Sequence, residues 1–230
     1  MCGRYVLTTP GEVLAELFEL DEKPHLAPRW NIAPTQEVAI VRRRDEGREL
    51  ALARWGLIPS WAKDAAIGNR MINARAETVA EKPAFRDSFR KRRCLMPADG
   101  FYEWQKIGAR KQPWLLRRKG GAPFAFAALW SRWHDPASGR PVETCALLTT
   151  TPNALASRVH DRMPVILPRE AFALWLDPGA EPGALGALLA PLPAEQMEAW
   201  SVSTRVNDPR HDDASCVARA AADGGPPGAA

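Results

Sequence analysis

A cysteine at the second position, Cys2, carries the most distinctive chemistry in this sequence. The initiator methionine is normally removed before a small residue, so the mature chain is expected to begin with Cys2 and a free α-amine. An amine with a pKa of about 7.7–8.0 and a thiol with a pKa of about 8.5 would then occupy adjacent carbons. Such a 1,2-aminothiol can condense with an aldehyde, first to a Schiff base and then to a thiazolidine ring. Alternatively, the thiol can attack an acyl carbon with the α-amine as its base.

Three further segments carry groups that titrate or bind anions. Residues 73–77, Asn-Ala-Arg-Ala-Glu, place an amide, a guanidinium and a carboxylate within five positions. Glu103 is a lone acid among aromatic residues, and burial in a strand would raise the pKa of its carboxyl toward neutrality. His160 is followed by Asp161 and Arg162 just before an apolar run. These segments supply acids, bases and cations that a nucleophile could use.

The overall composition is that of an ordinary globular protein. Of its 230 residues, 46% are hydrophobic and 25% charged, and no apolar stretch approaches the roughly 18 residues of a membrane helix. Residues 1–5 lead into no apolar signal-peptide region. We therefore expect a cytoplasmic protein with no membrane partner. The four cysteines show no metal-ligand spacing, so we expect no disulfide, no metal site and no cofactor.

The positive charge is concentrated in the first half of the chain. Residues 1–110 carry 19 basic and 15 acidic groups, a net charge of +4, whereas residues 111–230 carry 12 of each. Most of the basic residues are arginines, which bind phosphates and stack on bases. The nine tryptophans offer further ring faces for unpaired bases. This composition is compatible with nucleic-acid binding, although a GC-rich genome would produce the same enrichment in Arg, Ala, Gly and Pro.

The apolar pattern predicts more strands than helices. Thr9 and Pro10 precede an amphipathic pattern at 12–18, which predicts a capped helix with Pro10 at its first position. Alternating runs at 37–44 and 49–55 flank an Asp-Glu-Gly turn and predict a hairpin. The remaining predictions are strands at 94–105, 113–118, 124–130, 142–150 and 200–206, short helices at 169–176 and 183–189, and a partly helical segment at 75–93.

Strands in meander order with few, scattered helices favour an α+β fold. We expect a single domain built on a mixed or antiparallel, barrel-like β-sheet with short flanking helices. The domain is expected to span residues 1–217. Residues 218–230, mostly Ala, Gly and Pro, are predicted to form a disordered tail.

Seven short motifs stand in a fixed order along the chain. They are Met-Cys-Gly-Arg-Tyr at 1–5, Trp-Asn-Ile-Ala-Pro-Thr at 30–35, Trp-Gly-Leu-Ile-Pro-Ser-Trp at 55–61, Asn-Ala-Arg-Ala-Glu at 73–77, Cys-Leu-Met-Pro-Ala-Asp-Gly-Phe-Tyr-Glu-Trp at 94–104, Leu-Thr-Thr at 148–150 and His-Asp-Arg-Met-Pro at 160–164. In this order they resemble the motifs of one family, the SRAP (SOS-response-associated peptidase) family. The resemblance extends from residue 2 to about residue 207 and includes every segment singled out above.

The resemblance implies a protein that binds abasic sites in single-stranded DNA and crosslinks itself to their open-chain aldehyde. Cys2 would form a thiazolidine with the aldehyde. Asn73 would hold the nucleophile or the sugar hydroxyls, and Glu103 would act as the acid and base of Schiff-base formation, ring closure and reopening. His160 would protonate or orient the opened sugar, or assist strand cleavage by β-elimination. DNA lyase and self-processing peptidase activities are compatible with the same residues.

The resemblance also implies a set of DNA contacts. Arg75 and Arg162 are expected to bind phosphates, with Arg4 and Arg86 as weaker candidates. Trp61 and, less strongly, Trp55 are expected to stack on bases. Thr149 is expected to be a further DNA contact. We expect a monomer associated with the nucleoid. No motif in the sequence identifies a partner at the replication fork.

Three other functions fit parts of the sequence. Class II glutamine amidotransferases begin with a similar Met-Cys-Gly, and ammonia release from glutamine would identify one. A thiol peptidase could use Cys2, His160 and Glu103. A non-catalytic single-strand-binding module would rely on Arg and Trp alone, would bind in a salt-dependent manner regardless of the lesion, and would not need Cys2.

Overall fold

The computed structural model describes residues 2–45 and 47–220. Five strands form a closed ring: β3 (Glu37–Arg44), β4 (Gly47–Trp55), β6 (Arg93–Ala98), β9 (Phe124–His134) and β10 (Pro141–Thr150). The order β10-β4-β3-β6-β9 closes because β9 also pairs with β10. The β10–β4 pair is parallel and the others are antiparallel, so the ring is a mixed barrel. The predicted α+β class and barrel-like sheet are therefore confirmed.

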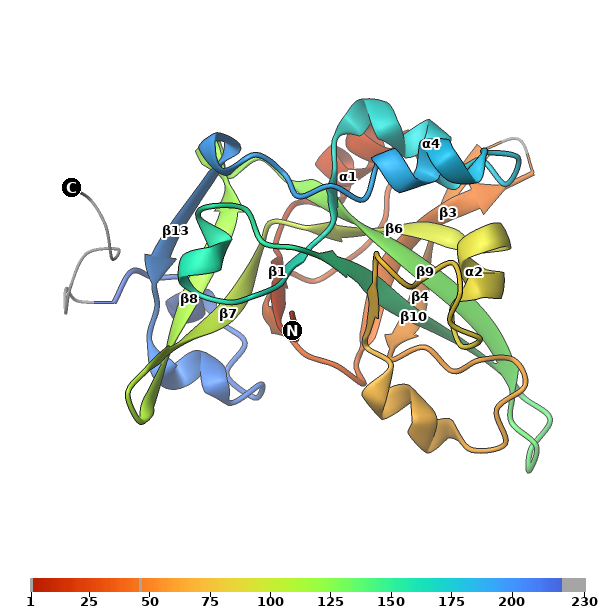
Figure 1. The fold of residues 1–230 in the computed structure, drawn as a ribbon, viewed down its shortest axis with the longest axis horizontal. Coiled ribbons are helices and arrows are strands. Elements are labelled where there is room, and N and C mark those ends of the chain that lie inside the picture. Colours follow the sequence, from red (N-terminus) through yellow and green to blue (C-terminus); the bar gives the residue numbers. More distant parts are fainter. Residues whose placement is uncertain (1, 46, 221–230) are drawn as a thin grey trace.

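A second, antiparallel sheet lies beside the barrel. Its order is β13 (Met197–Ser201), β8 (Arg110–Arg118), β7 (Gly100–Ile107), β1 (Tyr5–Leu7) and β2 (Arg29–Ile32). Figure 1 shows β7, β8 and β13 on one side of the molecule and the barrel on the other, with β1 between them. The N-terminal strand therefore lies where the two sheets meet.

Short elements complete the structure. The strands are β5 (Asn73–Arg75), which runs parallel to β10, β11 (Met163–Pro164) and β12 (Ile166–Leu167). The α-helices are α1 (Gly11–Phe18), α2 (Arg86–Lys91), α3 (Phe172–Leu176) and α4 (Pro182–Ala187). The 3-10 helices are η1 (Ala65–Arg70), η2 (Lys119–Gly121), η3 (Ala156–Arg158), η4 (Arg169–Ala171), η5 (Ala194–Gln196), η6 (Thr204–Asn207) and η7 (Ala214–Cys216).

Aromatic side chains join the two sheets into one core. Tyr5 of β1 makes edge-on contacts with Trp55 at 5.5 Å and with Phe126 at 6.0 Å between ring centroids. Phe101 of β7 contacts the same Phe126 ring at 6.1 Å. All four side chains are fully buried. Because edge-to-face pairs add to the free energy of burial, this cluster anchors β1 and β7 against the barrel.

The predicted strand at 94–105 is two strands in different sheets. The chain changes sheets at Asp99, between β6 and β7. The Asp99 carboxylate accepts hydrogen bonds from the backbone N–H and hydroxyl groups of both Thr8 and Thr9, at 2.5–3.0 Å. Thr9 is therefore not the cap of α1, and Pro10 occupies the N-cap position instead. The long-range contact to Asp99 takes the hydroxyl that local capping would use.

Most other element predictions are confirmed. The predicted hairpin is present as β3 and β4, with Arg44 opposite Gly47. The helices predicted at 169–176 and 183–189 are η4 with α3, and α4. The strand predicted at 200–206 ends at Ser201, and η6 follows. Of the predicted tail, residues 218–220 belong to the fold because Arg219 pairs with Val202, and residues 221–230 lie outside the described residues.

Candidate functional site at the junction of the two sheets

The pairing of β1 with β7 brings Cys2 toward Glu103. Tyr5 lies opposite Phe101, and the N–H of Tyr102 donates to the carbonyl of Arg4 at 2.9 Å. Cys2 is fully buried, with its Sγ 4.0 Å from the Arg4 carbonyl oxygen. Burial raises the pKa of its thiol well above the ordinary value, and the negative charge of Glu103 acts in the same direction. A base is therefore needed to ionise this thiol.

Asn73 reaches the same point from the barrel. Its β5 strand is held in parallel register on β10, with Asn73 opposite Leu147. The side-chain Nδ2 donates a hydrogen bond to the carbonyl of Cys2 at 2.9 Å. Among the described residues, no group hydrogen-bonds the Asn73 Oδ1, although it is buried. Asn73 therefore fixes the backbone of Cys2 and keeps an acceptor available beside it.

Glu103 and His160 form the titratable pair of the site. Nε2 of His160 lies 4.0 Å from Oε2 of Glu103. Burial raises the pKa of the Glu103 carboxyl to about 7, with the carboxylate of Asp161 adding to the effect. The prediction of a raised pKa for Glu103 is thus confirmed. Burial also lowers the pKa of His160, which favours its neutral ring. The Glu103 carboxyl, by contrast, can exchange protons near neutral pH.

Two different groups contact the other ring nitrogen of His160. The N–H of Arg162 donates to Nδ1 at 3.0 Å, whereas Oδ1 of Asp161 lies 2.9 Å from the same atom. The first contact requires an unprotonated Nδ1, and the second is a hydrogen bond only when Nδ1 carries a proton. The two contacts therefore require opposite protonation states of Nδ1, and in either state Nε2 is the ring nitrogen that faces Glu103.

The guanidinium of Arg162 is held by protein groups. Its two Nη atoms contact the Glu77 carboxylate at 2.7 and 2.8 Å, and Nη2 also donates to the Thr149 carbonyl at 2.7 Å. The hydrogen bond from Arg162 lowers the pKa of Glu77. Thr149 is only 1% exposed, so its side chain offers no free surface in this structure. Its carbonyl instead positions Arg162.

Arg4 makes internal contacts. Its Nη1 donates to Oδ1 of Asn31 at 2.8 Å and to the Val206 carbonyl at 2.5 Å, and its Nη2 donates to the Asn207 carbonyl at 3.4 Å. The guanidinium also lies over the ring of Trp104. Arg4 thus fastens the C-terminal segment to the strand that follows Cys2. Its Nη donors are directed at protein acceptors, whereas its buried Nε has no hydrogen-bond partner among the described residues.

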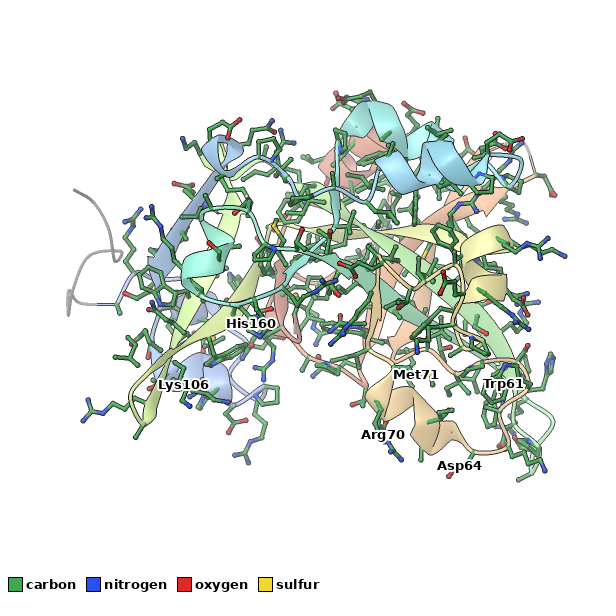
Figure 2. The ribbon with its side chains drawn as sticks, in the orientation of Figure 1. Trp61, Asp64, Arg70, Met71, Lys106 and His160 are labelled. Atoms are coloured by element: carbon green, nitrogen blue, oxygen red, sulfur yellow. The ribbon has the colours of Figure 1, made fainter. Side chains whose placement is uncertain are left out.

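The other expected DNA contacts divide by exposure. Trp55 is fully buried and its indole N–H donates to the Ile72 carbonyl at 2.9 Å, so the prediction that it stacks on bases is wrong. Trp61 is 57% exposed. Arg75 and Arg86 are also exposed. The Nε of Arg86 lies 3.9 Å from Oδ1 of Asp87. Figure 2 shows Trp61 at the lower right of the molecule, well apart from His160.

The sequence reasoning missed two residues that organise the site. Asn31 donates from Nδ2 to three carbonyls of the C-terminal segment, and the Asp212 carboxylate accepts from the N–H of Asn31 at 2.8 Å. Asn31 lies within the motif at 30–35, which was a usable signal. Asp212 gave none, because its partner is 181 residues away.

In the part of the chain that the structure describes, no three His, Cys, Asp or Glu side chains gather as metal ligands. None of its helices there is long and apolar enough to cross a membrane.

Comparison with known proteins places the whole site within one family. Residues 1–209 match the family described as SOS response associated peptidase (SRAP). The chain is 42% identical over 222 residues to the abasic site processing protein YoqW of Bacillus subtilis, which covers 94% of this chain and 99% of that protein. It is 31% identical over 226 residues to the abasic site processing protein YedK of Escherichia coli, with coverage of 94% and 99%.

Solved structures agree with this assignment. An X-ray structure of a protein from Bacteroides thetaiotaomicron has a TM-score of 0.86 and 29% identity to this chain, with coverage of 96% of this chain and 100% of that one. A protein from Bordetella bronchiseptica has a TM-score of 0.77, also at 29% identity, with coverage of 88% and 100%. The range matched by the family, residues 1–209, spans the positions of Cys2, Asn73, Glu103 and His160, and the chain belongs to the SRAP family.

Proposed function

We propose that this protein processes abasic sites in DNA by forming a covalent thiazolidine through Cys2, after removal of Met1. The observation that carries the proposal is that Asn73, Glu103 and His160 lie together beside Cys2, the N-terminal residue of the mature chain. Asn73 holds the Cys2 carbonyl at 2.9 Å, and the Glu103 carboxyl, with a pKa of about 7, lies 4.0 Å from the His160 ring. The names of the relatives support the choice of the lesion as substrate.

The reaction needs no external oxidant or reductant. The α-amine of Cys2 adds to the aldehyde carbon of the open-chain sugar, and the resulting hydroxyl leaves as water to give a Schiff base. The Cys2 sulfur then adds to the same carbon, and the thiol proton moves to the nitrogen. One C–N bond and one C–S bond form, and one water is released. Ring closure consumes the iminium that would otherwise promote β-elimination and break the strand.

Glu103 supplies the proton transfers of this sequence. In its protonated form it donates to the departing hydroxyl, and as a carboxylate it accepts the proton of the buried thiol. A pKa near 7 allows both forms at physiological pH. His160, with Nε2 facing Glu103, orients the opened sugar. The buried Oδ1 of Asn73 accepts a hydrogen bond from either the α-amine of Cys2 or a sugar hydroxyl.

The electrostatics of the thiol favour crosslinking over peptide hydrolysis. Cysteine hydrolases use a thiolate whose pKa is lowered by a neighbouring imidazolium. Burial raises the pKa of Cys2, and the His160 ring faces Glu103. An aminothiol that condenses with an aldehyde begins with the amine and requires the thiolate only at ring closure.

The strand that carries the lesion is single-stranded in this proposal. The exposed Arg75 and Arg86 bind its phosphates, and the exposed Trp61 stacks on a base. Arg162 contributes when a phosphate displaces Glu77 from its guanidinium. The protein acts as a monomer close to the nucleoid.

The test compares the Cys2→Ala and Cys216→Ser variants with the unchanged protein on single-stranded DNA containing one abasic site. Cys216 is a buried thiol outside the site, so its variant is the matched control. A denaturing gel should show a heat-stable shifted band for the unchanged protein and for Cys216→Ser, and none for Cys2→Ala. A shifted band of normal yield with Cys2→Ala would overturn the assignment.

A further inference from the structure

The β7–β8 hairpin ends in a cluster of positive charges. Lys106 lies directly opposite Lys111 across the two strands, and Ile107 lies opposite Arg110. Like charges in directly opposed positions of an antiparallel pair destabilise the pair. Within residues 2–45 and 47–220, neither lysine nor Arg110 forms an ion pair. The hairpin therefore carries an electrostatic cost that a bound anion would remove.

Nearby acids do not balance these charges. The C-terminal segment that contacts β7 through Trp104 carries Asp208, Asp212 and Asp213. Each of these carboxylates has its own cation, namely Arg210, Arg29 and Arg205, respectively. The net field at the tip of the hairpin is therefore positive.

The same strand leads from the hairpin tip to the candidate site. Glu103 belongs to β7, and a strand rises about 3.3 Å per residue, so Lys106 lies about 10 Å from Glu103 and Ile107 about 13 Å. Figure 2 shows Lys106 beyond His160, in the direction of the hairpin tip. Gln105 on the same strand donates to the carbonyl of Arg158 at 2.9 Å, so the backbone of a fourth exposed cationic residue lies beside β7.

An exposed apolar side chain accompanies the cations. Ile107 is 56% exposed, and the turn beyond it uses Gly108 at a φ of +57°. Ile107 and Arg110 share one face of the hairpin, and Lys106 and Lys111 share the other, because successive side chains of a strand point to opposite faces. Cations on both faces and an exposed aliphatic group match a nucleic-acid strand, which offers phosphates and the faces of unstacked bases. An acidic peptide would offer the negative charges without those faces.

We infer that the tip of the β7–β8 hairpin, formed by Lys106, Ile107, Arg110 and Lys111, is a second DNA contact that holds the nucleotides flanking the lesion. The inference rests on the proposed function, because it assigns the hairpin to the same strand. Phosphate contacts at this distance act on binding and leave the reacting atoms untouched. The hairpin therefore raises affinity equally for abasic and intact DNA, and it does not change the rate of ring formation in the bound complex.

The experiment measures the salt dependence of binding to intact single-stranded DNA and the crosslinking rate at saturating abasic DNA. The test variant is Lys106→Ala/Arg110→Ala/Lys111→Ala. The control variant, Lys119→Ala/Arg140→Ala/Arg169→Ala, loses the same three charges elsewhere. Each phosphate contact contributes about 0.7 to the slope of log K against log salt for single strands. The test variant should lose about 2 from that slope and bind ten- to a hundredfold more weakly near 0.1 M salt.

A third variant separates binding from folding. Lys111→Glu places opposite charges across the hairpin, so its thermal stability should equal or exceed that of the unchanged protein, while DNA binding weakens. Equal salt slopes for the test and control variants would overturn the inference. A loss of slope in a protein that forms no crosslink would support the hairpin contact and contradict the proposed function. A slower crosslinking rate at saturation would also contradict the inference, because it would place the hairpin in the reaction itself.

Discussion

The side-chain Nδ2 of Asn73 donates a hydrogen bond to the backbone carbonyl of Cys2, at 2.9 Å and across 71 positions of sequence. This bond joins the barrel to the strand that carries the nucleophile. It fixes the direction in which the α-amine and thiol of Cys2 face. The Cys2 residue is thereby positioned by a residue from the other sheet.

Asn73→Ala should slow crosslinking without unfolding the protein. The variant loses one hydrogen bond to the Cys2 carbonyl, which contributes about 1 kcal/mol to stability. The loss of orientation at the nucleophile should cost more, about tenfold or above in rate. Single-turnover crosslinking at saturating abasic DNA measures the rate, and chemical denaturation measures the stability. An unchanged rate would remove Asn73 from the site.

Glu103→Gln should slow crosslinking by about 100-fold or more, because it removes a general acid–base group. The unchanged protein should show an inflection near pH 7 in its rate, at the pKa of the Glu103 carboxyl. The glutamine variant should lack that inflection. Rates measured between pH 5.5 and 8.5 at saturating DNA test this, and a preserved inflection would assign it to another group.

The same carboxyl should make the protein less stable as the pH rises. Unfolded, Glu103 titrates near its ordinary pKa of 4.5, whereas in the folded protein its pKa is about 7. Between these values the folded state keeps a proton that the unfolded state has released, so stability falls with rising pH and levels off above pH 7. At pH 8, Glu103→Gln should be more stable than the unchanged protein by roughly 3 kcal/mol, since the folded and unfolded pKa values differ by about 2.5 and a difference of one corresponds to about 1.4 kcal/mol. At pH 4 the variant and the unchanged protein should have equal free energies of unfolding in urea. A difference between them that stays constant from pH 4 to pH 8 would contradict the raised pKa.

Substitution of the two tryptophans of the motif at 55–61 should have different effects, on stability for Trp55 and on DNA binding for Trp61. Trp55→Ala should cost about 3–5 kcal/mol of stability, because its ring is fully buried against Tyr5. Trp61→Ala should change stability by less than about 1 kcal/mol and weaken single-strand binding by about 1–3 kcal/mol. Urea unfolding and fluorescence anisotropy with a labelled strand separate the two effects. Unaltered binding by Trp61→Ala would exclude it from the DNA contact.

Local patterns in the sequence predicted much of the fold. The alternation at 37–44 and 49–55 predicted the β3–β4 hairpin, because its contacts are local. The aromatic surroundings of Glu103 indicated a buried strand in which its pKa would be raised, although alternation along the strand favoured a carboxyl that faces solvent. Both features depend on neighbours within a few positions.

Features set by distant contacts were not predicted. The change of sheet at Asp99 depends on hydrogen bonds to Thr8 and Thr9, about 90 positions away. The burial of Trp55 depends on the closure of the barrel over Tyr5, and its motif gave no sign of which ring faces solvent. The internal contacts of Arg4 likewise depend on the C-terminal segment, which packs on β1 from 202 positions away.

The measurement that tests the central claim most directly is the intact mass of the protein after reaction with an abasic oligonucleotide. We predict that the protein lacks Met1 and that a single adduct forms, with the summed mass of protein and DNA less one water. The Cys2→Ala variant should give no stable adduct. An adduct that retains Met1, or an equal yield of adduct from Cys2→Ala, would contradict crosslinking through the N-terminal aminothiol.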